Sequence, residues 1–338
     1  MSAMLDKLLG GLRFSWLAFG LHLLRLSPVL TQSPAMTDDD AVESFKLPFC
    51  RKGHSTVEGF LDKEHFLIVF GGKGLNYKES GTRWLNDLWT LTLDTSDLTD
   101  IRFVWMQRED LISTNNAQRW GYGLASNTLG GVMLVGGMDS DSSLYLNDSW
   151  LWLPSSRGWM AASPSSPWLG TSAGPCPRVG LVVLSFPKEG VAVLIGGETA
   201  HRDSRHRDEV ACLSDAYSIR TGPVLASLSG EGVADSDADI SWRRLADMPG
   251  PCLLNSASVA VSMGGRDLIF RFGGSHLGGK KQFFSSTILL YDLAEDSWQV
   301  IAPPYGSSIW PPGRDRHAIA YSRKVFDLNK YELDLSLH

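Results

Sequence analysis

The sequence predicts an all-β fold assembled from a repeated four-stranded unit. Two observations lead to this prediction. A run of apolar residues ends in a pair of glycines four times, and each pair is followed by a segment with an aromatic residue and then by a further tryptophan. Short apolar runs bounded by Gly, Asn, Asp and Pro are typical of strands. No amphipathic helical stretch of useful length follows residue 45.

The apolar runs FLIVFGG, VMLVGG, VAVLIGG and LIFRFGG form the second strand of each unit. Their glycine pairs are Gly71–Gly72, Gly136–Gly137, Gly196–Gly197 and Gly273–Gly274, separated by 65, 60 and 77 residues. A near-continuous apolar strand is typical of burial on both faces, so each unit must pack between others like itself. We expect each strand to end at its glycines, because glycine allows a sharp exit and close backbone approach.

The other strands are indicated by aromatic residues and by a short segment that precedes each apolar run. The segments after the glycine pairs are LNDLWTLTLD, LNDSWLWL, LSDAYSI and STILLYDL, with Trp89, Trp150, Tyr217 and Tyr291; a later tryptophan follows each, namely Trp105, Trp159, Trp242 and Trp298. RKGHS, RWGYG and PRVGL precede the first three pairs. The fourth copy, near Asn255, has lost the arginine, and a fifth copy, GRDRHAIAYS, begins at Gly313. We expect the aromatic residues to be buried between units.

Units of this kind stack radially in a β-propeller. The strand, Gly-Gly, Asn-Asp-Leu-Trp and distant Trp together resemble the kelch repeat, an architecture shared with galactose oxidase-like domains. The resemblance covers residues 45–323 and implies a kelch-type β-propeller with four complete blades and a partial fifth. Kelch propellers usually have six or seven blades, so the ring is expected to be open or truncated, or else small and closed by a strand at Glu43–Phe49. The units exceed the roughly 50 residues of a kelch repeat, and the excess is expected in loops.

Residues 1–44 form a leader with an acidic spacer, and residues 324–338 form an atypical tail. Lys7 and Arg13 precede the apolar stretch Phe14–Leu24, and small residues follow up to Ala35, which is the order of a secretory signal peptide. A mitochondrial presequence and an unstructured start are the alternatives. The apolar stretch is too short to span a bilayer. The sequence favours the cytoplasm and the secretory pathway equally, with mitochondria behind them.

Composition and motifs argue against several kinds of chemistry. The net charge of −6 makes nucleic acid an improbable partner. The four cysteines have no CxxC spacing and are too sparse to imply a disulfide scaffold. We find no HExxH or Walker motif, and therefore predict no catalytic residue, metal or cofactor. His54 and His317 occupy the same place in their units and are interpreted as structural.

The function predicted from the resemblance is a non-catalytic scaffold that binds a protein partner through propeller loops. The loop candidates are Trp168, in a Pro/Ser-rich connector, and His201, Arg205 and His206, in the mixed-charge segment HRDSRHRDE. The alternative is a carbohydrate-active enzyme or carbohydrate-binding protein of the secretory pathway on the same fold. The fold alone does not decide between them.

Overall fold

The computed structural model describes residues that lie almost entirely in the unit Lys46–Ile319. They are residues 48, 50–61, 64–76, 81–94, 102–108, 119–126, 131–139, 143–153, 159–161, 174–186, 188–202, 208–220, 242–278, 281–305 and 310–321. All regular structure in these ranges is β-strand. In the same ranges, no helix has the length and apolarity needed to cross a membrane.

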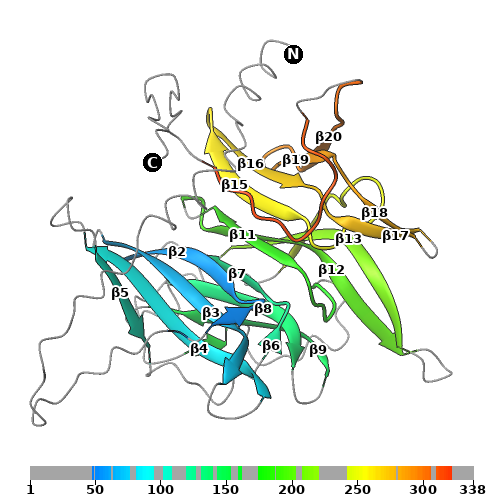
Figure 1. The fold of residues 1–338 in the computed structure, drawn as a ribbon. Helices are drawn as coiled ribbons and strands as arrows, with labels where there is room; N and C mark the ends of the chain where they lie inside the picture. Colours follow the sequence, from blue (N-terminus) through cyan, green and yellow to red (C-terminus); the bar gives the residue numbers. More distant parts are fainter. Residues whose placement is uncertain are drawn as a thin grey trace, which may run out of the picture. The chain divides into compact units, whose positions relative to one another are not determined.

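Four antiparallel sheets follow one another along the chain (Figure 1). Sheet 1 contains β1 (Arg51–Lys52), β2 (Ser55–Leu61), β3 (Glu64–Asn76), β4 (Gly81–Asp94) and β5 (Arg102–Gln107). Sheet 2 contains β6 (Arg119–Trp120), β7 (Gly123–Ser126), β8 (Val132–Asp139), β9 (Tyr145–Trp152) and β10 (Trp159–Ala161). Sheet 3 contains β11 (Val182–Phe186), β12 (Val191–Arg202), β13 (Asp208–Arg220) and β14 (Arg243–Leu245). Sheet 4 contains β15 (Ala257–Met263), β16 (Arg266–Phe272), β19 (Ile288–Asp292) and β20 (Ser297–Ile301), and β17 (Ser275–Gly278) pairs with β18 (Lys281–Phe284) as a separate hairpin.

The four sheets share one strand order. In sheet 1, β1 and β2 both pair with the same edge of β3, and β6 and β7 do the same with β8. Single bridges, Val179 to Glu198 and Leu254 to Ser275, replace the short first strand in sheets 3 and 4. The repeat seen in the sequence is therefore a repeat of hydrogen-bonded topology.

The glycine pairs share one backbone conformation but do not end the strands as expected. All eight glycines have positive φ, between 59° and 68° at the first position and between 91° and 102° at the second. In sheets 1, 2 and 3 the register shifts at the pair and the strand continues beyond it into a hairpin. Only in sheet 4 does the second strand end, at Phe272, before the glycines. Positive φ creates a bulge here, and a bulge bends a strand without stopping it.

We expect Gly197→Ala to lower the free energy of unfolding by about 2 kcal/mol or more, since an L residue is strained at its φ of 102°. An added Cβ would also lie 2.8 Å from the Val179 carbonyl oxygen. Gly264 has a φ of 61° with no atom within 4 Å of a built Cβ, so Gly264→Ala is the matched control, at about 1 kcal/mol. Urea denaturation of both variants checks this; equal losses would contradict the close packing at Gly197.

The second strands of sheets 2 and 3 are buried on both faces, as their apolar runs predict, whereas in sheet 1 Leu67 of β3 is 41% exposed. On β8, Val132 and Leu134 pack in a cluster with residues of sheet 1, whereas Met133 and Val135 pack with sheet 3. β12 alternates in the same way, with Ala192 and Leu194 in the cluster with sheet 2 and Val193 and Ile195 in the cluster with sheet 4. Consecutive sheets thus share continuous apolar cores.

The tryptophans differ in burial, and the fifth copy differs from its expected form. Trp89 and Trp242 are buried, while Trp150 and Trp298 are partly buried against the cores of their sheets. The fifth copy, GRDRHAIAYS, is expected to start with a strand like the other units, but residues 316–321 have no strand partner among the described residues. The segment Glu43–Phe49, offered as a closing strand, and residues 324–338 lie outside the described residues, apart from Pro48.

Candidate functional site

Each of the first three sheets contains a buried arginine bound to an aspartate of the same sheet. Arg51, Arg119 and Arg178 each form two hydrogen bonds to one carboxylate, from Asp87, Asp148 and Asp215 respectively, with N–O distances of 2.6–3.0 Å. Each also donates from Nη1 to the carbonyl of the first glycine of its pair, at 3.0–3.1 Å. We call this arrangement the arginine clamp. It fixes the first segment of the unit to the second and third strands.

The clamp explains the Asn-Asp-x-Trp sequence. In sheets 1 and 2 the indole Nε1 of Trp89 and of Trp150 donates to the clamp carboxylate two residues earlier, at 2.6 Å. In sheet 3 the guanidinium of Arg178 instead lies 5.5 Å from the ring centroid of Tyr217. Sequence reasoning had identified both the arginine and the Asn-Asp-Leu-Trp motifs but had not paired them.

Charge neutralisation accounts for the burial of Arg178. Burial by itself lowers the pKa of this guanidinium, but hydrogen bonds from it to Asp215 and the negative charge of Asp215 outweigh burial, so the pKa is raised. The side chain is 1% exposed and that of Asp215 is 13% exposed. The clamp is therefore a buried ion pair whose function is structural.

Consecutive units are joined by backbone contacts that repeat. The second glycine of sheet 2, Gly137, donates its N–H to the carbonyl of Arg178, and Gly274 of sheet 4 donates in the same way to Arg314. The Nε groups of Arg178 and Arg314 both donate to the carbonyl two residues earlier. Arg314 thus stands at the clamp position of the fifth copy.

His54 and His317 each lie three residues after a clamp-position arginine, at equivalent places in their units. Partial burial lowers the pKa of both imidazoles, and the charges of Arg51 and Arg314 lower it further. His317 packs edge-on to Phe272 as Tyr122 packs on Phe70. The contact of His317 agrees with a packing role, whereas His54 is exposed.

Sheet 4 has lost both partners of the clamp. Leu253 occupies the arginine position, because the bridge at Leu254 matches the bridge at Val179, the residue after Arg178. The next residue, Asn255, has a φ of 55° and stands where the other units have glycine. Leu289 lies two residues before Tyr291, which is the aspartate position. Both leucines are buried in one apolar cluster. An ion pair in three units is thus an apolar pair in the fourth.

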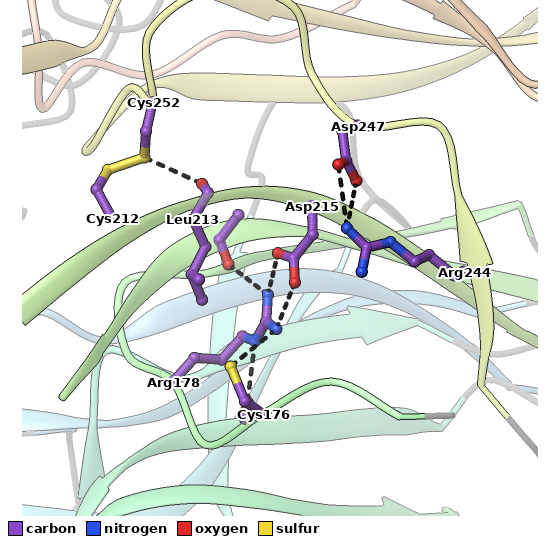
Figure 2. Close-up of polar contacts among 9 residues, drawn as sticks. Cys176, Arg178, Cys212, Leu213, Asp215, Arg244, Asp247 and Cys252 are labelled. Carbon is purple, nitrogen blue, oxygen red and sulfur yellow. Dashed lines mark hydrogen bonds and ion pairs between the residues drawn. A yellow bond between two sulfur atoms is a disulfide. The ribbon is translucent and has the colours of Figure 1, made fainter. Parts of the chain in front are cut away.

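A disulfide joins sheet 3 to the segment that enters sheet 4. Cys212, on β13, is bonded to Cys252, immediately before Leu253, with a Cα–Cα distance of 5.8 Å (Figure 2). Figure 2 shows it near the Arg178–Asp215 clamp, where Cys176 contacts the guanidinium at 3.4 Å. Forty residues separate the bonded cysteines, and sequence spacing alone does not identify such a pair.

Hairpins extend beyond the glycine pairs and expose apolar side chains. Leu144, Val210, Phe283 and Phe284, from the hairpins of sheets 2, 3 and 4, are 47–64% exposed. In sheet 1, Lys73 lies 4.9 Å over the ring of Trp84, which stacks on Trp120 of sheet 2 at 5.9 Å. Each of these residues lies beyond the glycine-pair end of a second strand or next to that end. Phe103, Val104 and Met106 of β5 and Val300 of β20 are exposed to a similar degree.

A cavity of about 470 Å³ is lined by the first long strands of all four sheets, β2, β7, β11 and β15. Its lining includes the hydroxyl residues Ser55, Thr56, Ser126, Ser185 and Ser258. Ser126 and Ser185 are hydrogen bonded to each other at 2.9 Å. We call this space the hub cavity.

The loop candidates from the sequence are not placed by the structure. Trp168, Arg205 and His206 lie outside the described residues, and for His201 only the backbone, within β12, is described. Among the residues that are described, no group of three or more His, Cys, Asp or Glu side chains could hold a metal ion.

Comparison with known proteins identifies a fold but no relative in sequence. No family model and no curated protein matches the chain. The solved structure of YjhT, a β-propeller-type protein, has a TM-score of 0.50 at 16% identity, covering 79% of this chain and 73% of that one. A chain in the cryo-EM structure of RAG in complex with one melted RSS and one unmelted RSS has a TM-score of 0.48 at 14% identity, covering 77% and 68%. The chain is therefore similar to β-propeller proteins in fold, with several antiparallel sheets of repeated topology.

Proposed function

We propose that the chain is a kelch-type β-propeller protein that acts as a non-catalytic interaction scaffold and binds a protein partner through the hairpins beyond its glycine pairs. The carrying observation is the exposure of Leu144, Val210, Phe283 and Phe284 on three of these hairpins. Aromatic and apolar side chains of this kind supply most of the binding energy at protein interfaces. By contrast, the charges of each arginine clamp pair with each other within one sheet and are not available to a ligand.

Partner capture by hairpin variants tests this function. The full chain and a Phe283→Ser/Phe284→Ser variant would be compared by proximity labelling in the native cell type. Tyr305→Ser is the matched control, because Tyr305 is fully exposed but lies outside the hairpins. We expect a set of proteins labelled by the wild type and the control but lost from the double variant. Identical labelling by all three would reject the hairpins as the binding surface.

For the compartment, we propose the secretory pathway. The observation that favours it is the Cys212–Cys252 disulfide, because disulfides form and persist in oxidising compartments and are rare in the cytosol. Alkylation of protein in intact cells, followed by non-reducing peptide mapping, should recover the two cysteines as a linked peptide. Recovery of both as alkylated thiols would place the protein in a reducing compartment.

A further inference from the structure

Sheet 4 contains a buried arginine that differs from the clamp arginines. Arg271, on β16, is 2% exposed. It donates from Nη2 to the Leu253 carbonyl at 2.9 Å and from Nη1 to the Ser258 hydroxyl at 3.3 Å, and its Nε has no acceptor among the described residues. Within the same residues, no carboxylate forms an ion pair with it. Where the other sheets bury a neutral pair, sheet 4 buries a cation.

The buried cation is one residue away from the hub cavity. Ser258 lies opposite Arg271 in the β15–β16 register and also lines the cavity. Because the Ser258 oxygen accepts a hydrogen bond from a guanidinium, its own proton is free to be donated elsewhere. A charged donor strengthens the next bond in such a chain. Ser258 therefore presents a polarised hydroxyl donor at the cavity wall.

We propose that the hub cavity binds a small anion, a carboxylate or a phosphate that also carries hydroxyl or amino groups, with its charged end at Ser258. An uncompensated buried cation is strongly unfavourable, and an anion at Ser258 would supply the missing countercharge.

Electrostatics at Arg271 support an anion rather than a neutral ligand. Desolvation lowers the pKa of this guanidinium to about 10, so it remains cationic at neutral pH. An anion bound nearby would raise that pKa again, as Asp215 does for Arg178. The anion would lie at the first strands and not at the hairpins, so its binding is independent of partner binding.

Isothermal titration of the full chain with gluconate, glycerol 3-phosphate and glycerol at constant ionic strength tests the proposal. We expect binding of at least one anion and no binding of glycerol; the anion that binds distinguishes a carboxylate ligand from a phosphate ligand. Ser258→Ala should weaken the affinity about tenfold or more, the size of a lost charge-assisted hydrogen bond. Ser262→Ala is the control, because Ser262 is on the same strand but is exposed and bonded to Asp267.

Arg271→Met gives a second measurement and should abolish anion binding. If that variant does not fold, as judged by circular dichroism, Ser258→Ala decides alone, since it leaves the guanidinium in place. Failure of both anions to bind at millimolar concentration, or unchanged affinity in Ser258→Ala, would overturn the proposal.

Discussion

Asp215→Ala is expected to lower the free energy of unfolding by about 3–5 kcal/mol, the cost of leaving one member of a buried ion pair alone. Arg178 would remain 1% exposed with no carboxylate partner. Its remaining acceptors would be neutral carbonyls and the Cys176 sulfur. Guanidinium denaturation followed by tryptophan fluorescence measures the loss.

Two further variants make the clamp experiment decisive. Arg178→Leu/Asp215→Leu copies the Leu253 and Leu289 pair of sheet 4, and should recover most of the stability lost by Asp215→Ala. Asp247→Ala removes a carboxylate that is 50% exposed and bound to Arg244 (Figure 2), so it should cost about 1 kcal/mol or less. A loss in Asp215→Ala no larger than in Asp247→Ala would show that the clamp does not stabilise the fold.

Removal of the Cys212–Cys252 disulfide is expected to cost about 4 kcal/mol, from the entropy of the loop that it closes. The bonded cysteines are 40 residues apart, which places most of sheet 3's third and fourth strands and the entry to sheet 4 inside that loop. Cys212→Ser/Cys252→Ser should therefore denature at markedly lower denaturant concentration than the wild type.

Reduction by dithiothreitol provides an independent version of the same experiment. It should destabilise the wild type and leave the double variant unchanged. Cys50→Ser is the control, because Cys50 is an exposed free thiol and its replacement should have little effect. If reduction shifts the wild type and the double variant equally, the cysteines are not bonded in solution.

The sequence predicted the parts of the fold that repeat locally. Apolar runs and glycine pairs located the second strands, and their alternating burial follows from strand geometry. The strand continuation through Gly71–Gly72 could not be foreseen, because positive φ allows either a bulge or an exit. Which one occurs depends on whether the following segment finds a partner strand, as Leu75 does in Thr82.

Contacts between distant residues were beyond the reach of sequence patterns. Arg51 and Asp87 are 36 residues apart, and their pairing depends on sheet register. Likewise, nothing local marked Arg271 as buried, since an arginine in a second strand normally indicates an exposed face. It lies on the same face of β16 as Ile269, which packs in the apolar cluster shared by sheets 3 and 4.

Sheet 4 has two leucines where the other sheets have the clamp, and this difference limits how one form of the unit can change into the other by mutation. A path of single substitutions passes through a unit with one buried charge, a loss of about 3–5 kcal/mol against a typical total of about 5–15 kcal/mol. Such an intermediate stays folded only if the free energy of unfolding of the whole chain exceeds this loss. The disulfide ends at Cys252, the residue before Leu253, and contributes stability at the same junction. A covalent bond at this position therefore widens the set of substitutions that the junction between sheets 3 and 4 tolerates.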